Sequence, residues 1–126
     1  QVLEGAVQDV LSRTTDAFRK GDLHLAGKVE PLETVVDELV RAIKARHVAR
    51  LQTGSCSIEY GFVLEDLLTN YERVADHCSN IAGCIIDMAD NNMNLHETLK
   101  EVRKNNPEFD EMRDSFAEKY SFSSLA

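Results

Sequence analysis

The chain has 126 residues, the size of one ordinary domain, and is long enough to bury a core without disulfides or a structural metal. Its formal charge is −8, from 22 acidic and 14 basic side chains, which argues against direct binding to nucleic acid or to an anionic membrane. With six Gly and two Pro, the chain has few helix breakers, which favours long helices over a sandwich or barrel. The composition therefore predicts an all-α domain whose charge suits cations, basic partners or simple solubility.

The cysteine count and the lack of a long apolar stretch further restrict the class of protein. The cysteine count is odd and no C-x-x-C motif is present, which is typical of reduced thiols and not of a disulfide framework or zinc site. No stretch approaches the roughly 18–20 apolar residues that span a bilayer, so we expect no direct membrane insertion of this chain. Because Gln1 already lies in a helical pattern, we expect a piece of a longer protein with any membrane part outside it.

The first half of the chain predicts two helices. Apolar residues at helical spacing predict a helix over residues 2–20. Gly21 interrupts the pattern, and Asp22 is a good N-cap for a second helix over about 23–52. Pro31 lies inside the second segment, where proline removes one helical hydrogen bond. We therefore expect either a kink at Pro31 or a helix that begins near it.

A clear turn precedes a third helix. Residues 53–55 form the turn, and Ser55 or Ser57 can cap a helix over about 57–90. Short connections between successive helices favour antiparallel neighbours. Residues 1–90 are therefore predicted to form an up-down-up three-helix bundle.

The remainder of the chain is predicted to be a C-terminal helical extension, residues 91–126, which packs on the bundle. Its helical pattern is weak over residues 95–104. Asn106 is a good N-cap and Pro107 suits the first helical position of a short helix over about 108–120.

Four acidic residues form two matched pairs. Glu33 and Asp37 lie four residues apart in the second predicted helix, and Glu72 and Asp76 have the same spacing in the third. Side chains at this spacing emerge on one helical face about one turn apart. Like charges so placed repel each other, and a bound cation would reverse the sign of that interaction.

The turn at Gly54 predicts where the two pairs meet. The midpoints of the pairs are equally far from this turn, so an antiparallel hairpin sets Glu33 and Asp37 level with Glu72 and Asp76. Both pairs also lie on the same side of the apolar stripes of their helices. Level carboxylates without a balancing Lys predict a hard-oxygen cation site in outline.

Other interpretations stay open beside the metal site. Acids some distance from an apolar stripe are often a solvated face, and Arg41 and Lys44 continue the same face and can neutralise part of it. If the four acids are only a solvated face, the chain is a helical oligomerisation or protein-interaction module without a metal function. A metal-dependent enzyme is a third possibility, but no His has an acid three residues before it, as ferritin-like di-iron sites require. His77 points away from Asp76 and is expected to be a core-edge group and not a ligand.

Two segments resemble a known family. The stretch Tyr71-Glu-Arg-Val-Ala-Asp-His-Cys-Ser-Asn-Ile-Ala82 resembles the L-E-R-I-G-D-H-x-x-N-I-A helix of PhoU-like domains. The stretch from Ala26 to Leu39 looks like the partner helix with its own E-x-x-x-D motif, so the resemblance covers about residues 1–90. The acidic tail is similar to the C-terminal, cytoplasmic PhoU-like domains of bacterial sodium/phosphate cotransporters.

The resemblance implies a non-enzymatic regulatory domain of phosphate uptake. It implies a divalent or trivalent metal ion, iron or zinc, held by Glu33, Asp37, Glu72 and Asp76. The implied partners are a transporter membrane domain or other phosphate-transport machinery, with a homo-oligomer as a further possibility. The implied location is the cytoplasmic face of the inner membrane. The chain departs from the family in having Ala75 where Gly is common, and one repeat where a free-standing PhoU has two.

Overall fold

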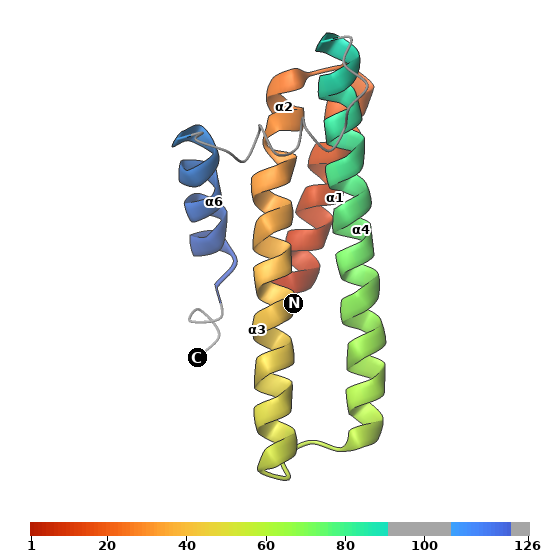
Figure 1. Cartoon of the computed structure of the whole chain (residues 1–126), viewed down its shortest axis with the longest axis vertical. Coiled ribbons are helices and arrows are strands. Elements are labelled where there is room, and N and C mark those ends of the chain that lie inside the picture. The colour runs from red at the N-terminus through yellow and green to blue at the C-terminus, as the bar shows by residue number, and fades with distance from the viewer. Residues whose placement is uncertain (91–106, 122–126) are drawn as a thin grey trace.

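The computed structural model describes residues 1–90 and 107–121, and all regular secondary structure in these ranges is helical (Figure 1). The helices in chain order are α1 (Val2–Lys20), α2 (Leu23–Gly27), α3 (Val29–Gln52), α4 (Ile58–Asp90) and α6 (Pro107–Lys119). The predicted all-α class is confirmed. None of these helices is long and apolar enough to cross a membrane.

The first predicted boundary is confirmed in detail. Helix α1 ends at Gly21, whose φ of 61° lies in the left-handed region that glycine adopts without a Cβ clash. The carboxylate of Asp22 then accepts hydrogen bonds from the backbone N–H groups of His24 at 2.9 Å and Leu25 at 3.2 Å. Asp22 is therefore the N-cap of α2, as the sequence predicts.

The second predicted helix is two helices. Helix α2 ends at Gly27, Lys28 separates the two, and α3 begins at Val29. Pro31 is thus the third residue of α3, where a backbone N–H has no partner inside the helix and its loss costs little. Of the two alternatives at Pro31, the structure shows a helix that begins near the proline.

A tight turn joins α3 to α4. Gly54 has a φ of 74°, which again requires the left-handed conformation. The hydroxyl of Ser57 accepts a hydrogen bond from the backbone N–H of Tyr60 at 3.3 Å, whereas Ser55 pairs with the hydroxyl of Thr53. Ser57 is therefore the residue that caps α4.

Helices α1, α3 and α4 pack around one apolar core, with α1 parallel to α4 and α3 antiparallel to both (Figure 1). The largest fully buried aliphatic side chains come from all three helices: Val10, Val29, Leu32, Val35, Val36, Val40 and Leu68. The predicted up-down-up bundle is confirmed, and the short α2 caps one end of it.

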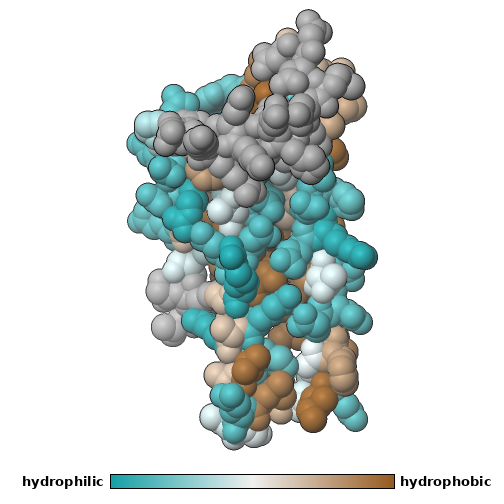
Figure 2. Space-filling model, viewed as in Figure 1, coloured by the Kyte–Doolittle hydropathy of each residue, from teal (hydrophilic) through white to brown (hydrophobic). Residues whose placement is uncertain are grey.

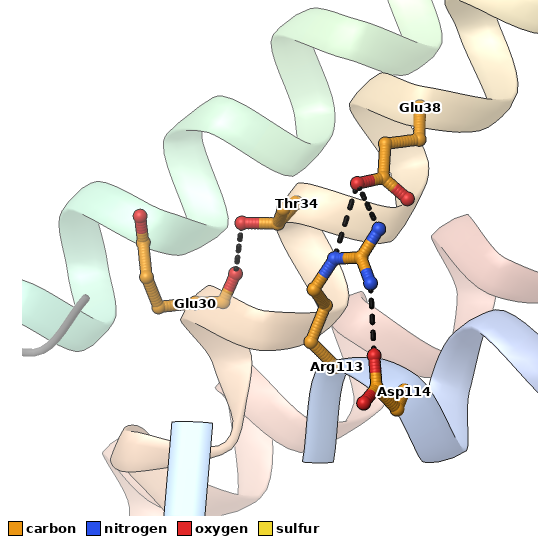
Figure 3. A network of polar contacts seen from close by, with 5 residues as sticks. All are labelled: Glu30, Thr34, Glu38, Arg113 and Asp114. Atoms are coloured by element: carbon orange, nitrogen blue, oxygen red, sulfur yellow. Dashed lines mark hydrogen bonds and ion pairs between the residues drawn. The ribbon is translucent and has the colours of Figure 1, made fainter. Parts of the chain in front are cut away.

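Helix α6 packs beside α3 and reaches α1 through side chains near its C-terminal end. Its Phe109 and Phe116 are buried, and the Tyr120 hydroxyl just beyond it donates a hydrogen bond to Asp9 of α1 at 2.7 Å. On α3, Glu38 accepts a hydrogen bond at 3.1 Å from the guanidinium Nε of Arg113 (Figure 3). Helix α6 thus packs on the bundle.

Parts of the predicted extension are not described. The helical patch over 95–104 and the cap at Asn106 lie outside the described residues, and the division of the chain at residue 90 stays a prediction.

A candidate cation site at the α3–α4 seam

The register of the α3–α4 hairpin is fixed by two polar contacts. The hydroxyl of Ser79 donates to the buried carboxylate of Glu30 near one end, and Lys44 forms an ion pair with Glu65 at 3.2 Å nearer the turn. Both pairs are symmetric about the turn at Gly54. The same symmetry sets Glu33 and Asp37 opposite Asp76 and Glu72, so the predicted register is confirmed.

All four predicted acids line one open groove at this seam, which we call the acidic groove. Its volume is about 310 Å³. The lining residues are Glu33, Asp37, Thr69, Glu72, Arg73 and Asp76. The hairpin therefore brings all four predicted metal ligands to one groove.

Burial of the four carboxylates changes across the groove. Glu33 is only 4% exposed, Asp37 and Glu72 are half-buried, and Asp76 is exposed. A cation entering from solvent would meet Asp76 first and Glu33 last. The inner carboxylate experiences less screening by water, so its interaction with a cation would be the strongest of the four.

The groove also contains a cation that the sequence analysis missed. Arg73 is exposed and lines the groove beside the four acids, so the described lining residues carry a formal charge of −3 rather than −4. The available signal was its position, one residue after Glu72 and three before Asp76, which places it near the same helical face. Lys44, which the sequence analysis names as able to neutralise part of this face, pairs with Glu65.

The donor atoms suit a hard cation. Among the described residues that line the groove, every titratable side chain except Arg73 is a carboxylate, and none is His or Cys. Carboxylate oxygens are preferred by hard ions, whereas zinc sites are mostly built from thiolate and imidazole. Within residues 1–90 and 107–121, however, no three potential ligands are close enough together to hold a metal ion as they stand. Binding would thus require the carboxylate side chains to turn toward a common point.

Glu30 lies one turn before Glu33 and supports the seam from inside. Its side chain is only 2% exposed and accepts the hydrogen bond from Ser79. Its backbone carbonyl accepts a hydrogen bond from the Thr34 hydroxyl at 3.1 Å (Figure 3). A carboxylate held in this way fixes α3 against α4 at the inner end of the acidic groove.

The histidine and thiol nearest the motif lie elsewhere. His77, which follows Asp76, lines a groove at the α1–α4 seam, so it faces away from the acids as the sequence analysis expects. Cys78 is buried in the core, and this burial raises the pKa of its thiol.

Comparison with known proteins identifies the family. The PhoU domain model matches residues 3–85, which is more than half of the chain and includes all four acids. The phosphate-specific transport system accessory protein PhoU homolog 1 of Thermotoga maritima is 29% identical over 98 residues, 78% of this chain and 42% of that protein. The chain thus spans less than half the length of this curated relative. No solved structure shows a significant match. The chain belongs to the PhoU domain family.

Proposed function

We propose that this chain is a regulatory, non-enzymatic domain of phosphate uptake that binds a metal ion in the acidic groove. Membership of the PhoU domain family supports the regulatory role. The relative from Thermotoga maritima is named as an accessory protein of a phosphate-specific transport system, which supports the same class of function here. The acidic tail favours a more specific setting, the cytoplasmic PhoU-like domain of a sodium/phosphate cotransporter at the inner membrane.

The single observation that carries the metal proposal is the convergence of the two E-x-x-x-D motifs. Four carboxylates from two helices line one groove, and among the described residues of its lining Arg73 carries a positive charge. Carboxylates at this spacing repel each other, so a bound cation stabilises an arrangement that is otherwise unfavourable. The residues that would hold the ion are Glu33, Asp37, Glu72 and Asp76, whose oxygen donors suit hard cations.

Calorimetric titration with ferrous and zinc ions tests the assignment. The double variant Asp37→Asn plus Asp76→Asn removes one carboxylate from each helix and keeps side-chain size. We expect this variant to bind metal at least about tenfold more weakly than the natural chain, because each removed ligand weakens a hard-oxygen site.

A matched control distinguishes the loss of groove carboxylates from a change in the net charge of the chain. The variant Glu59→Gln plus Asp66→Asn changes the net charge equally, on exposed positions of α4 that do not line the groove. We expect it to bind metal like the natural chain. Equal affinity and stoichiometry in all three proteins would show that the four acids are not the site.

The transporter setting has its own test. The reading frame that encodes this chain should specify several membrane-spanning segments upstream of Gln1 if the chain is part of a cotransporter. A reading frame without such segments would contradict this setting and leave the metal proposal unaffected.

A further inference from the structure

The end of the α3–α4 hairpin, residues 46–63, exposes a cluster of large apolar side chains, and we call it the hairpin end. Tyr60 is 74% exposed and Phe62 is 69% exposed. The other large exposed apolar side chains of the hairpin end are Val48, Leu51, Ile58 and Val63. Brown patches are visible at the lower end of Figure 2, where Figure 1 places the turn. Clustered exposed apolar side chains are typical of an interaction site.

These apolar side chains surround α4 instead of lining one face of it. Successive residues of a helix are rotated by about 100°, so Ile58 and Tyr60 lie on nearly opposite sides of α4. Residues 58–67 include no buried residue, so neither side is fully covered by the described part of the chain. A protein that packs along one side of the hairpin would leave the other side in water. A surface that meets the hairpin end-on would contact both sides at once.

The depth of this apolar layer matches a lipid interface. The layer from Ile58 to Val63 occupies about 7 Å along the axis of α4. The register about Gly54 sets Val48 and Leu51 of α3 level with the same layer. Amphipathic helices at a membrane surface bury their apolar side chains about 5–10 Å into the headgroup boundary. Tyrosine is favoured at this depth because its ring is apolar while its hydroxyl can meet water.

The hairpin end also reverses the sign of the chain's charge. Arg46 and Arg50 are exposed and outnumber Glu59, so residues 46–63 carry a formal charge of +1 while the other residues together carry −9. By the same register, the two arginines lie level with the two ends of the apolar layer, where their long side chains can reach lipid phosphates. The acidic groove lies about 30 Å from the turn, several times the Debye length of about 8 Å, so its charge is largely screened there. The net charge of −8 therefore does not exclude an anionic membrane at this one surface.

We propose that the hairpin end docks end-on on a membrane surface that contains anionic lipids. The apolar side chains lie at the lipid interface without crossing the bilayer, the two arginines pair with lipid phosphates, and the acidic groove stays in water. The proposal goes beyond the regulatory function and depends neither on metal binding nor on the cotransporter setting. Binding is therefore measured with a chelator present, so that no metal ion can bridge the groove carboxylates and the lipid headgroups.

Co-sedimentation of the 126-residue chain with lipid vesicles tests the proposal. Vesicles of phosphatidylcholine with about 30% phosphatidylglycerol present an anionic surface, and pure phosphatidylcholine vesicles present a neutral one. We expect an apparent Kd below about 1 mM lipid on the anionic vesicles and at least about fivefold weaker binding to the neutral ones. The variant Arg46→Gln plus Arg50→Gln should weaken binding to anionic vesicles at least about fivefold. The control Arg19→Gln plus Lys20→Gln removes the same charge from exposed positions at the opposite end of the bundle and should weaken binding less than about twofold.

Fluorescence shows which end of the molecule meets the lipid. The chain contains no Trp, so one Phe→Trp substitution gives a signal without background. Phe62→Trp places the indole in the hairpin end, and Phe18→Trp places it near the C-terminal end of α1, on a phenylalanine that is 73% exposed. Anionic vesicles should shift the emission of Phe62→Trp to shorter wavelength, because its indole moves from water to the lipid interface. The emission of Phe18→Trp should stay unchanged.

Three results would each overturn the proposal. The first is no sedimentation with anionic vesicles at up to about 5 mM lipid, which would leave a protein with an acidic surface as the partner of the hairpin end. The second is equal binding to anionic and neutral vesicles, which would exclude the arginines as the lipid contact. The third is an equal loss of binding in the two charge variants or an equal emission shift in the two Trp variants, because the lipid would then not meet the hairpin end.

Discussion

Single residues decide how closely α3 and α4 approach near their turn. A Cβ built on Gly61 would lie 2.6 Å from Nε2 of His47, closer than real carbon atoms approach a ring nitrogen. The Nδ1 atom on the other side of the same ring lies 3.6 Å from Sγ of Cys56. The imidazole therefore fills the space between the two helices, and glycine is the residue that leaves room for it.

Gly61→Ala should destabilise the chain by about 1–2 kcal/mol, because the imidazole must move out of a packed position. In a His47→Ala background the same change should stabilise it by up to about 1 kcal/mol, since alanine favours a helix more than glycine does. Urea unfolding of the four proteins in this double-mutant cycle measures both values. If Gly61→Ala changes the free energy of unfolding equally in both backgrounds, the His47 imidazole is not what restricts residue 61.

At the scale of whole elements, α6 depends on one carboxylate of α1. Burial alone would raise the pKa of Asp9, but hydrogen bonds from Tyr120 and Arg13 and the nearby ammonium of Lys119 hold that pKa below its ordinary value. Burial and the hydrogen bond to Asp9 raise the pKa of the Tyr120 phenol. Arg13 also stacks on the buried Phe116 ring, 5.0 Å from its centre. These contacts hold α6 through the ionised form of Asp9.

Asp9→Asn should therefore destabilise the chain in a pH-dependent way. A carboxylate with a lowered pKa in the folded state adds stability above its unfolded pKa and loses it as pH falls through the folded pKa. We expect a loss of about 1 kcal/mol at pH 7 and a clearly smaller loss at pH 3, measured by urea unfolding.

Asp16→Asn is the matched control for this prediction. Asp16 lies on the same helix and pairs with the exposed Arg19 at 3.1 Å. Surface pairs of this kind contribute little, so the control should change stability by less than about 0.5 kcal/mol at both pH values. An Asp9→Asn effect that is equal at pH 3 and pH 7 would rule out the ionised carboxylate as the cause.

Comparison of these elements shows what sequence can predict. The ends of α1 and the register at Gly54 follow from local signals, since a left-handed glycine and a side-chain cap act within a few residues. The acids in the groove follow from that register and the 3.6-residue repeat. Arg73 was missed because a mixed-charge helix face does not reveal which cation turns toward the seam. The pairing of Asp9 with Tyr120 was not predictable, because no local pattern links residues 111 positions apart.

At the scale of the whole molecule, α1 covers only part of α4. Thr14 of α1 and Cys78 of α4 line the same cavity, which sets these residues at one level of the two parallel helices. Val2 is twelve residues before Thr14, so α1 reaches only to about residue 66 of α4. In agreement, Leu68 is 1% exposed whereas Val63 is 65% exposed.

Hydrogen exchange should show this difference along one continuous helix. Amides of residues 68–82, which pack under α1, should exchange at least about tenfold more slowly than those of residues 58–66, because local opening there exposes buried apolar surface. Mass spectrometry of overlapping peptides from α4 measures both rates. Uniform protection from residue 58 to 82 would mean that the hairpin end is covered in solution.

The symmetry of the hairpin about Gly54 also orders the loops that the chain must close. Lys44 and Glu65 enclose a short loop, Glu30 and Ser79 a longer one of 49 positions, and Asp9 and Tyr120 the longest, of 111. The entropy lost on closing a loop grows with its length. We therefore expect the chain to close outward from the turn, and the four acids to face one another before α6 has docked.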